Sequence, residues 1–221
     1  MPLTTNIFIF GWILENMKLV TPRTAAALSL AISTLVLLFS CICAGVVYWT
    51  KQDVDDNSSY TGLFVMQSQA DSSVVIMLTC GESMSDQQCS YLKSSKASAI
   101  IGILFGAIGA FLSFYNLRYE YRRISGLSFF IVGLFVALES LFYLMCIVIY
   151  SYFKDSYLTT NDDLNVEYPP ESKTEYAWAF NLMITALCFS FIHGCSLFYY
   201  SHKKTAIKRT PSEEGLFGFE K

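Results

Sequence analysis

Charged residues are scarce in this chain, and the sequence motifs of common enzymes are missing from it. Asp, Glu, Lys and Arg make up 15% of the 221 residues, whereas hydrophobic residues make up 53%. There are two histidines, and no P-loop, Gly-x-Ser-x-Gly or His-Glu-x-x-His motif occurs. The sequence therefore predicts neither an enzyme nor a bound cofactor. Basic residues are too few for a nucleic-acid-binding surface, which excludes nucleic acid as a partner.

Lys and Arg are absent from four long apolar runs, at residues 25–48, 97–115, 126–150 and 176–200. Each run is close to the roughly 20 residues that a helix needs to cross the hydrocarbon core of a bilayer. Because a chain in lipid must satisfy its backbone amides within the segment, we expect four transmembrane helices. No basic region with a compact cleavage site precedes the first run, which is therefore predicted to be an uncleaved signal anchor.

The segment before the first span, residues 1–24, contains a shorter apolar stretch at 7–14 that includes Trp12. This stretch is too short to cross a membrane. Two interpretations stay open: an amphipathic segment that lies in the membrane interface, or an apolar tail without fixed structure.

The basic residues cluster on one side of the predicted spans. Segments 1–24, 116–125 and 201–221 hold ten of the fifteen Lys and Arg, whereas loops 49–96 and 151–175 hold five basic and twelve acidic residues. By the positive-inside rule, both termini and the short middle loop are predicted to be cytoplasmic, and the two acidic loops to face outside. The ten residues are Lys18, Arg23, Arg118, Arg122, Arg123, Lys203, Lys204, Lys208, Arg209 and Lys221.

Loop 49–96 carries two signals that agree with an outside location. Asn57 begins the sequon Asn-Ser-Ser, a site for N-glycosylation in secreted chains. Cys80 and Cys89 lie outside the spans, and in an oxidising compartment such a close pair is expected to form a disulfide. The cysteines within the spans are expected to be packing residues. Cys41 and Cys43, two residues apart on a helix, do not share a face for a metal ion.

The same loop has the pattern of short strands. Segments 46–50, 60–66, 73–79 and 88–92 are rich in β-branched and aromatic residues, and clusters of Asp, Asn, Ser and Gly separate them. We expect a small antiparallel sheet on the helical bundle, with the cysteine pair joining its last two strands. Trp49, at the end of the first span, is expected to lie in the membrane interface.

Trp49, then Gly62-Leu63-Phe64, then Cys80 and Cys89 resemble the pattern of the claudin/peripheral myelin protein/TARP superfamily of four-span proteins. The chain departs from claudins where Phe64 replaces a Trp and where the first cysteine, Cys80, comes sixteen residues after Phe64. Gly-Leu-Phe is similar to the clarin branch. Further segments resemble clarins: Phe114-Tyr115-Asn116, Ile124-Ser125-Gly126 and Glu175-Tyr176 with Phe189 and His193-Gly194.

This resemblance implies a fold and a class of function. The fold is a left-handed all-α bundle of four membrane helices with a small antiparallel extracellular β-sheet in the first outside loop. The function is that of a non-enzymatic organiser or adaptor of the plasma membrane that binds other membrane proteins in cis or in trans. The resemblance also implies a location in sensory or synaptic membranes and a cytoskeleton-linked partner. One alternative is an auxiliary subunit that regulates an ion channel or receptor. Another is a component of claudin-like cell–cell adhesion or of a barrier.

Three glycines form a stripe in the second predicted span. Gly102 and Gly106 are four residues apart, and Gly109 lies near the same helix face. Small residues allow helices to approach closely in a membrane. The stripe predicts either packing within the bundle or formation of a homo-oligomer.

Two ionisable residues interrupt the apolar spans. Glu139 falls near the middle of the third span and His193 in the inner half of the fourth. A charge at such a depth is costly, so Glu139 is expected to be either neutral and bonded to a hydroxyl or turned to a polar partner. Their depths differ, which argues against a direct pair. A structural role and a role in binding a partner or handling ions both stay open.

Overall fold

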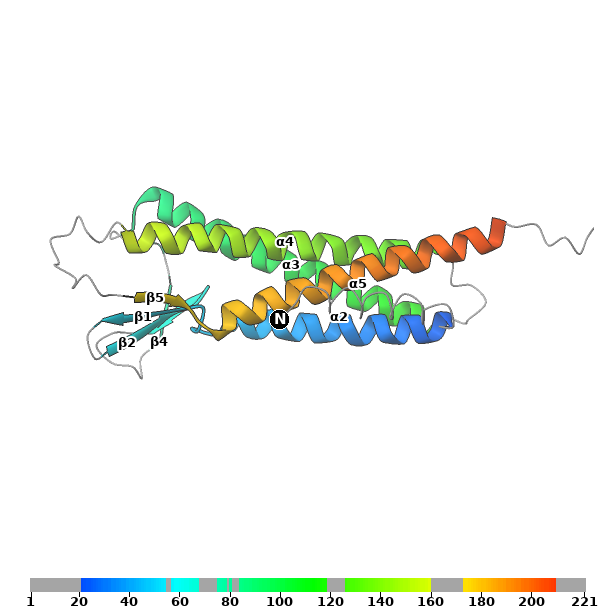
Figure 1. The fold of residues 1–221 in the computed structure, drawn as a ribbon, viewed down its shortest axis with the longest axis horizontal. Helices are drawn as coiled ribbons and strands as arrows, with labels where there is room; N and C mark the ends of the chain where they lie inside the picture. Colours follow the sequence, from blue (N-terminus) through cyan, green and yellow to red (C-terminus); the bar gives the residue numbers. More distant parts are fainter. Residues whose placement is uncertain are drawn as a thin grey trace, which may run out of the picture.

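Four long helices lie along one another and carry a small sheet at one end (Figure 1). The computed structural model describes residues 21–54, 57–67, 75–78, 80, 84–118, 126–159 and 173–209. The helices are α2 (Pro22–Gly45), α3 (Asp86–Arg118), α4 (Gly126–Thr159) and α5 (Trp178–Arg209). All four are long and apolar enough to cross a membrane, so the predicted four-span bundle is confirmed.

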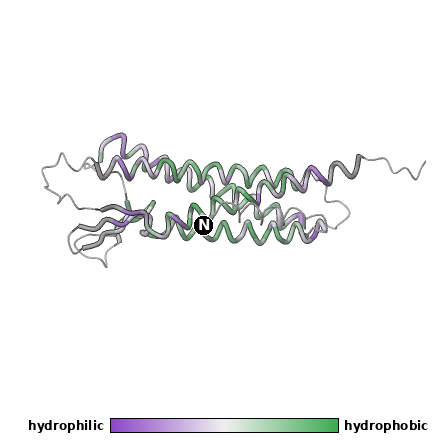
Figure 2. Tube along the Cα trace, viewed as in Figure 1, coloured by the Kyte–Doolittle hydropathy of each residue, from purple (hydrophilic) through white to green (hydrophobic). Residues whose placement is uncertain are grey.

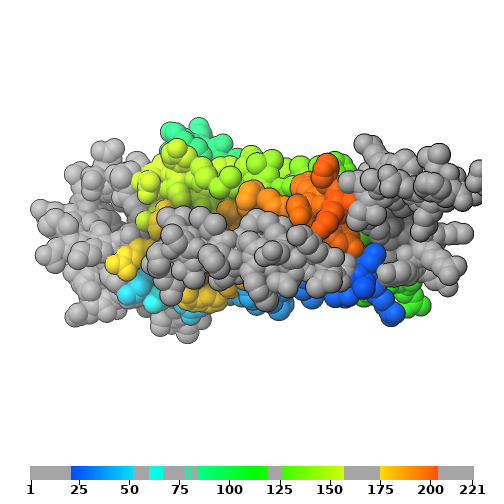
Figure 3. Space-filling view, turned by 45° about the vertical axis from the view of Figure 1, so that its right-hand side comes forward, coloured from blue at the N-terminus to red at the C-terminus, as the bar shows by residue number. Residues whose placement is uncertain are grey.

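The inner faces of α2 and α3 consist mainly of small or polar side chains, whereas α4 and α5 also bury large ones such as Tyr143 and Met183. Many large apolar side chains of all four helices point outward, as expected where lipid is the solvent. The inner face of α2 is built from Ala26, Ser29, Ser33, Val36, Ser40 and Cys43. Phe111 of α3 and Leu127 of α4 are 65% and 64% exposed. Figure 2 shows hydrophobic residues along the length of all four helices. Figure 3 shows α4 and α5 side by side on the surface of the bundle.

The sheet has five antiparallel strands in the order β4-β3-β2-β1-β5. Four come from the first loop: β1 (Thr50–Val54), β2 (Asn57–Thr61), β3 (Val65–Gln67) and β4 (Val75–Met77). The fifth, β5 (Lys173–Tyr176), comes from the second loop and pairs with β1, with Thr50 opposite Tyr176. The predicted antiparallel sheet is therefore present, but it joins both loops instead of belonging to the first alone.

The strand expected at 88–92 is wrong, because these residues form the first turns of α3. A capping box begins this helix: the Ser85 amide donates to Gln88 Oε1 at 2.9 Å, and the Gln88 amide donates to Ser85 Oγ at 3.3 Å. These reciprocal bonds satisfy amides that a helix start leaves without partners. The helix thus begins eleven residues before the predicted span at 97–115.

The early start of α3 makes it longer than a membrane requires. Its 33 residues correspond to about 50 Å, against about 30 Å for the hydrocarbon core. The 34 residues of α4 have a similar excess. Lys96 of α3 contacts Leu78 at the end of β4, and Lys154 of α4 contacts Tyr176 of β5. We call the sheet with these outer helical turns, which is the described part of residues 46–96 and 150–177, the head.

Candidate functional site: the head junction and the buried polar side chains

Trp49 lies at the centre of the junction between the head and the bundle. Its ring is completely buried, and its Nε1 donates a hydrogen bond to the Cys43 carbonyl at 2.6 Å in the last turn of α2. The ring packs on Tyr150 of α4 and Phe180 of α5, with centroids 4.7 and 5.9 Å away. The prediction that Trp49 lies in the membrane interface is wrong, because these contacts bury its indole ring in the protein core.

Gly62 and Leu63 complete this junction from the β2–β3 turn. The Gly62 amide donates to the Val65 carbonyl at 2.7 Å. A Cβ at Gly62 would lie 2.8 Å from the Cα of Val47, and closer still to the Val46 carbonyl oxygen. Leu63 is fully buried in the same core as Trp49. The Trp and Gly-Leu positions of the sequence motif are therefore one packing unit.

Tyr150 connects this unit to the sheet. Its hydroxyl donates to the Thr61 carbonyl at 3.2 Å and lies 3.3 Å from Thr50 Oγ1. Thr50 and Thr61 are opposite each other in the β1–β2 pair. One tyrosine of α4 thus holds the bundle-proximal end of two strands.

Phe64 has a partner of its own in α3. The Lys96 ammonium lies 5.5 Å from the centroid of its ring, a cation–π contact. The same ammonium donates to the Leu78 carbonyl, and the Leu78 amide donates to the Phe64 carbonyl at 2.8 Å. These contacts join the turn before β3, the end of β4 and α3.

A disulfide links Cys80 and Cys89, whose Cα atoms are 5.5 Å apart. It joins the segment after β4 to the first turn of α3 and not to another strand, because residue 89 is helical. Gln88, beside it, also donates from Nε2 to the Ser156 carbonyl of α4 at 2.9 Å. The outer ends of α3 and α4 are therefore attached to each other and to the sheet.

Within the bundle, the three glycines of α3 face α4 of the same chain. A Cβ at Gly102 would lie 2.6 Å from the Tyr143 ring, and one at Gly106 would collide with the Glu139 carboxyl group. At Gly109 it would meet Val136 at 3.4 Å. The glycine stripe thus gives space to two large buried side chains of α4.

Glu139 is 1% exposed and has hydroxyl groups as partners. Tyr143 donates to its Oε1 at 3.1 Å, and Ser190 of α5 donates to its Oε2 at 3.0 Å. Ser190 Oγ also lies 3.2 Å from the Val136 carbonyl. If Glu139 is protonated, its hydroxyl can donate to Ser190, which then donates to Val136. The group can therefore be fully hydrogen-bonded without a nearby cation.

His193 is also buried, at 4% exposed. Its Nε2 lies 2.9 Å from Ser29 Oγ of α2, which in turn lies 2.9 Å from Ser113 Oγ of α3. Ser113 donates to the Gly109 carbonyl at 2.9 Å. The two ionisable residues thus occupy separate hydrogen-bonded groups.

Residues 24–197 match the sequence model of the PMP-22/EMP/MP20/Claudin family. The matched residues include all five strands and most of each helix. The chain belongs to this family. No individual curated protein matches it. The superfamily resemblance is therefore confirmed, whereas the clarin branch stays a prediction.

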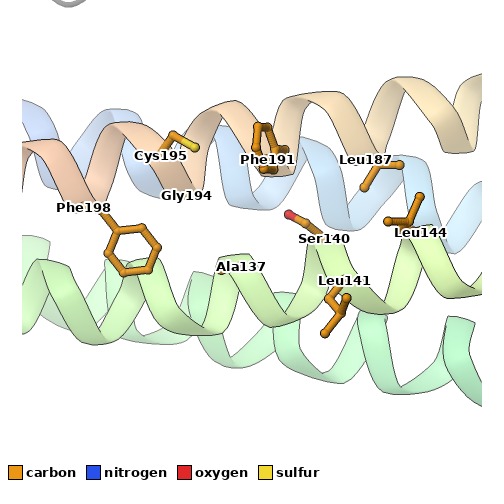
Figure 4. Close-up of a pocket in the computed structure, with 9 residues that line it drawn as sticks. All are labelled: Ala137, Ser140, Leu141, Leu144, Leu187, Phe191, Gly194, Cys195 and Phe198. Atoms are coloured by element: carbon orange, nitrogen blue, oxygen red, sulfur yellow. The ribbon is translucent and has the colours of Figure 1, made fainter.

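The surface of this claudin-family bundle has a groove between α4 and α5. Its volume is about 280 Å³, and its lining is apolar except for Ser140 and Cys195 (Figure 4). Ser140 Oγ lies 3.0 Å from Ser190 Oγ, so the floor of the groove touches the Glu139 group. Residues that line it include Ala137, Leu141, Leu144, Leu187, Phe191, Gly194 and Phe198.

Some predicted features lie outside the described residues or their described side chains. The stretch 7–14 with Trp12 and residues 119–125 lie outside the described residues. Asn57 begins β2, and its backbone pairs with Val54. Among the residues that the structure describes, no group of three or more His, Cys, Asp or Glu could hold a metal ion.

Proposed function

We propose that this claudin-family protein is a non-enzymatic organiser of the plasma membrane that recognises other membrane proteins through its head. In this proposal both termini are cytoplasmic and the head is outside the cell. Two observations support the orientation. Ten of the fifteen basic residues belong to segments 1–24, 116–125 and 201–221, which adjoin in sequence the helix ends opposite the sheet, and the head contains a disulfide.

The observation that carries the proposal is the attachment of the head to the bundle. Trp49 bonds to α2 and packs on α4 and α5, Lys96 of α3 bonds to the end of β4, and the disulfide joins the same region to α3. A surface that is fixed before binding loses little conformational entropy when a partner docks. Such a head is suited to recognition in cis or in trans.

The finer assignment, an organiser of the clarin type, rests on Phe64. Its contact with Lys96 gives Gly-Leu-Phe a structural partner in this chain. Because Phe64 stands where claudins have a Trp, we propose the clarin-like setting, with a cytoskeleton-linked partner in sensory or synaptic membranes, in preference to a barrier.

Two surface variants test the proposal. Ser90 and Lys93 are exposed on the outer turns of α3, whereas Leu104 and Phe111 face lipid in the same helix, at 57% and 65% exposure. The double variants S90R/K93E and L104A/F111A would be purified with their partners from native membrane and compared by quantitative mass spectrometry.

We expect S90R/K93E to lower the recovery of the principal membrane-protein partners severalfold, and L104A/F111A to leave it unchanged. Equal surface expression of both variants is the control for folding. The opposite result, a loss of a channel or receptor with L104A/F111A alone, would contradict recognition by the head and support an auxiliary subunit that binds through its helices.

A further inference from the structure

The two hydrogen-bonded groups in the bundle lie next to each other along its axis. Ser190 bonds to Glu139 and His193 bonds to Ser29, and these two residues of α5 are three positions apart on one helix face. The separation along the helix is about 4.5 Å. A single additional polar group between them would therefore connect Glu139 to His193.

Ser33 of α2 lies at the depth of the bundle between these two hydrogen-bonded groups. It is one helical turn, about 6 Å, from Ser29 on the inner face of α2. Because α2 and α5 run in opposite directions, the step from Ser29 to Ser33 and the step from His193 to Ser190 both lead toward the sheet. Ser33 is therefore at nearly the same depth as Ser190.

The Ser33 hydroxyl is buried and has no protein partner. The residue is 1% exposed, and among the described residues its Oγ makes no hydrogen bond. Other buried serines of the spans bond to the carbonyl four residues earlier, as Ser40, Ser113 and Ser140 do. A buried hydroxyl without a partner is unfavourable, so a ligand at this position is favoured.

Small residues of the neighbouring helices lie near the depth of Ser33. Counting from the Ser29–Ser113 contact, a step of four residues along α3 toward the sheet reaches Gly109. Gly106, which borders the Glu139 carboxyl group, is one turn further. Both glycines face Glu139 and Val136 of α4, and Ser190 of α5 supplies an oxygen at the depth of Ser33.

We propose that Ser33 binds a water molecule that joins the Glu139–Ser190 group to the Ser29–His193 group. Water suits the site because it can donate to one group and accept from the other. A metal cation suits it less, because Glu139 is the one acidic side chain in these groups and both of its oxygens already have hydroxyl partners. The result is a polar column that contacts all four helices inside the membrane.

The test uses the full-length protein in lipid nanodiscs. Nuclear magnetic resonance would measure magnetisation transfer from long-lived water to isotope-labelled serine in the wild type and in S33A. Thermal unfolding would be measured for S33A, for S29A and for T34A, a neighbouring position whose side chain is exposed and bonds to its own helix.

We expect transfer to Ser33 in the wild type and its loss in S33A. We also expect S33A to lower Tm by about 2–4 °C, because a ligand of the water is removed. S29A should lower Tm as well, whereas T34A should leave it unchanged. A bare unpartnered hydroxyl predicts the reverse sign, because its removal is neutral or stabilising. Absence of transfer in the wild type, or an unchanged or raised Tm for S33A, would overturn the proposal.

Discussion

Single residues at the head junction combine several contacts. Trp49 bonds to the last turn of α2 and packs on two other helices, and Tyr150 bonds to both strands of the β1–β2 pair. Gly62 contributes by having no side chain, since backbone atoms of residues 46 and 47 occupy the space of a Cβ. The sequence motif could be recognised as a family signature. The burial of Trp49 could not be predicted from the sequence, because a Trp at the end of a span is equally suited to the membrane interface.

Gly62 therefore offers a test of this close approach. We expect G62A to destabilise the protein by about 1–3 kcal/mol, because the new methyl group must displace the backbone at residues 46 and 47. Thermal unfolding in nanodiscs measures the effect. G45A is the matched control, because a Cβ at Gly45 would meet nothing within 4 Å. Equal stability of the two variants would show that the approach at Gly62 is not required.

The elements differ in how far the sequence predicts them. The four spans could be located because an apolar run of about 20 residues has few alternatives to a membrane helix. The start of α3 could not be located by hydropathy, since its outer turns are polar and include Tyr91, a residue type that also favours strands. The readable signal was the spacing of Ser85 and Gln88, a capping box that fixes the helix start.

Gln88 gives a prediction about this helix start. In Q88A the bond to the Ser85 amide and the bond to the Ser156 carbonyl are both lost. We expect a loss of about 1–2 kcal/mol of stability and faster amide hydrogen exchange over residues 85–90. The neighbouring Q87A is the control, because Gln87 is exposed and bonds to Tyr91 within the same helix. Equal exchange in both variants would contradict a stabilising role of the cap.

At the scale of the whole molecule, both loops contribute to one head. Pairing of β5 with β1 joins segments more than a hundred residues apart, and the short strand Lys173–Tyr176 has no local pattern that predicts its partner. The hydrogen-bonded groups around Glu139 and His193 were equally hard to predict. The two ionisable residues could be identified in the sequence, but their serine partners on other helices could not. Long-range contacts of this kind depend on how the helices pack.

The orientation of the molecule in the membrane can be tested at the tip of the β1–β2 hairpin. Asn57 pairs with Val54 at the end opposite the Thr50–Thr61 pair, which Tyr150 anchors. Four residues of strand place it about 13 Å further from the bundle. If the head is outside, this sequon passes through the secretory lumen at a distance that suits glycosylation.

We therefore expect N-glycosylation at Asn57 when the protein is expressed in cells with a eukaryotic secretory pathway. Removal of the glycan by an endoglycosidase would increase electrophoretic mobility in the wild type. The variants N57Q and S59A should lack this shift, because both destroy the sequon, whereas S58A should keep it, because the middle position is free. A wild type that reaches the plasma membrane unmodified would argue that the head faces the cytoplasm, and the proposed recognition of partners outside the cell would then fail.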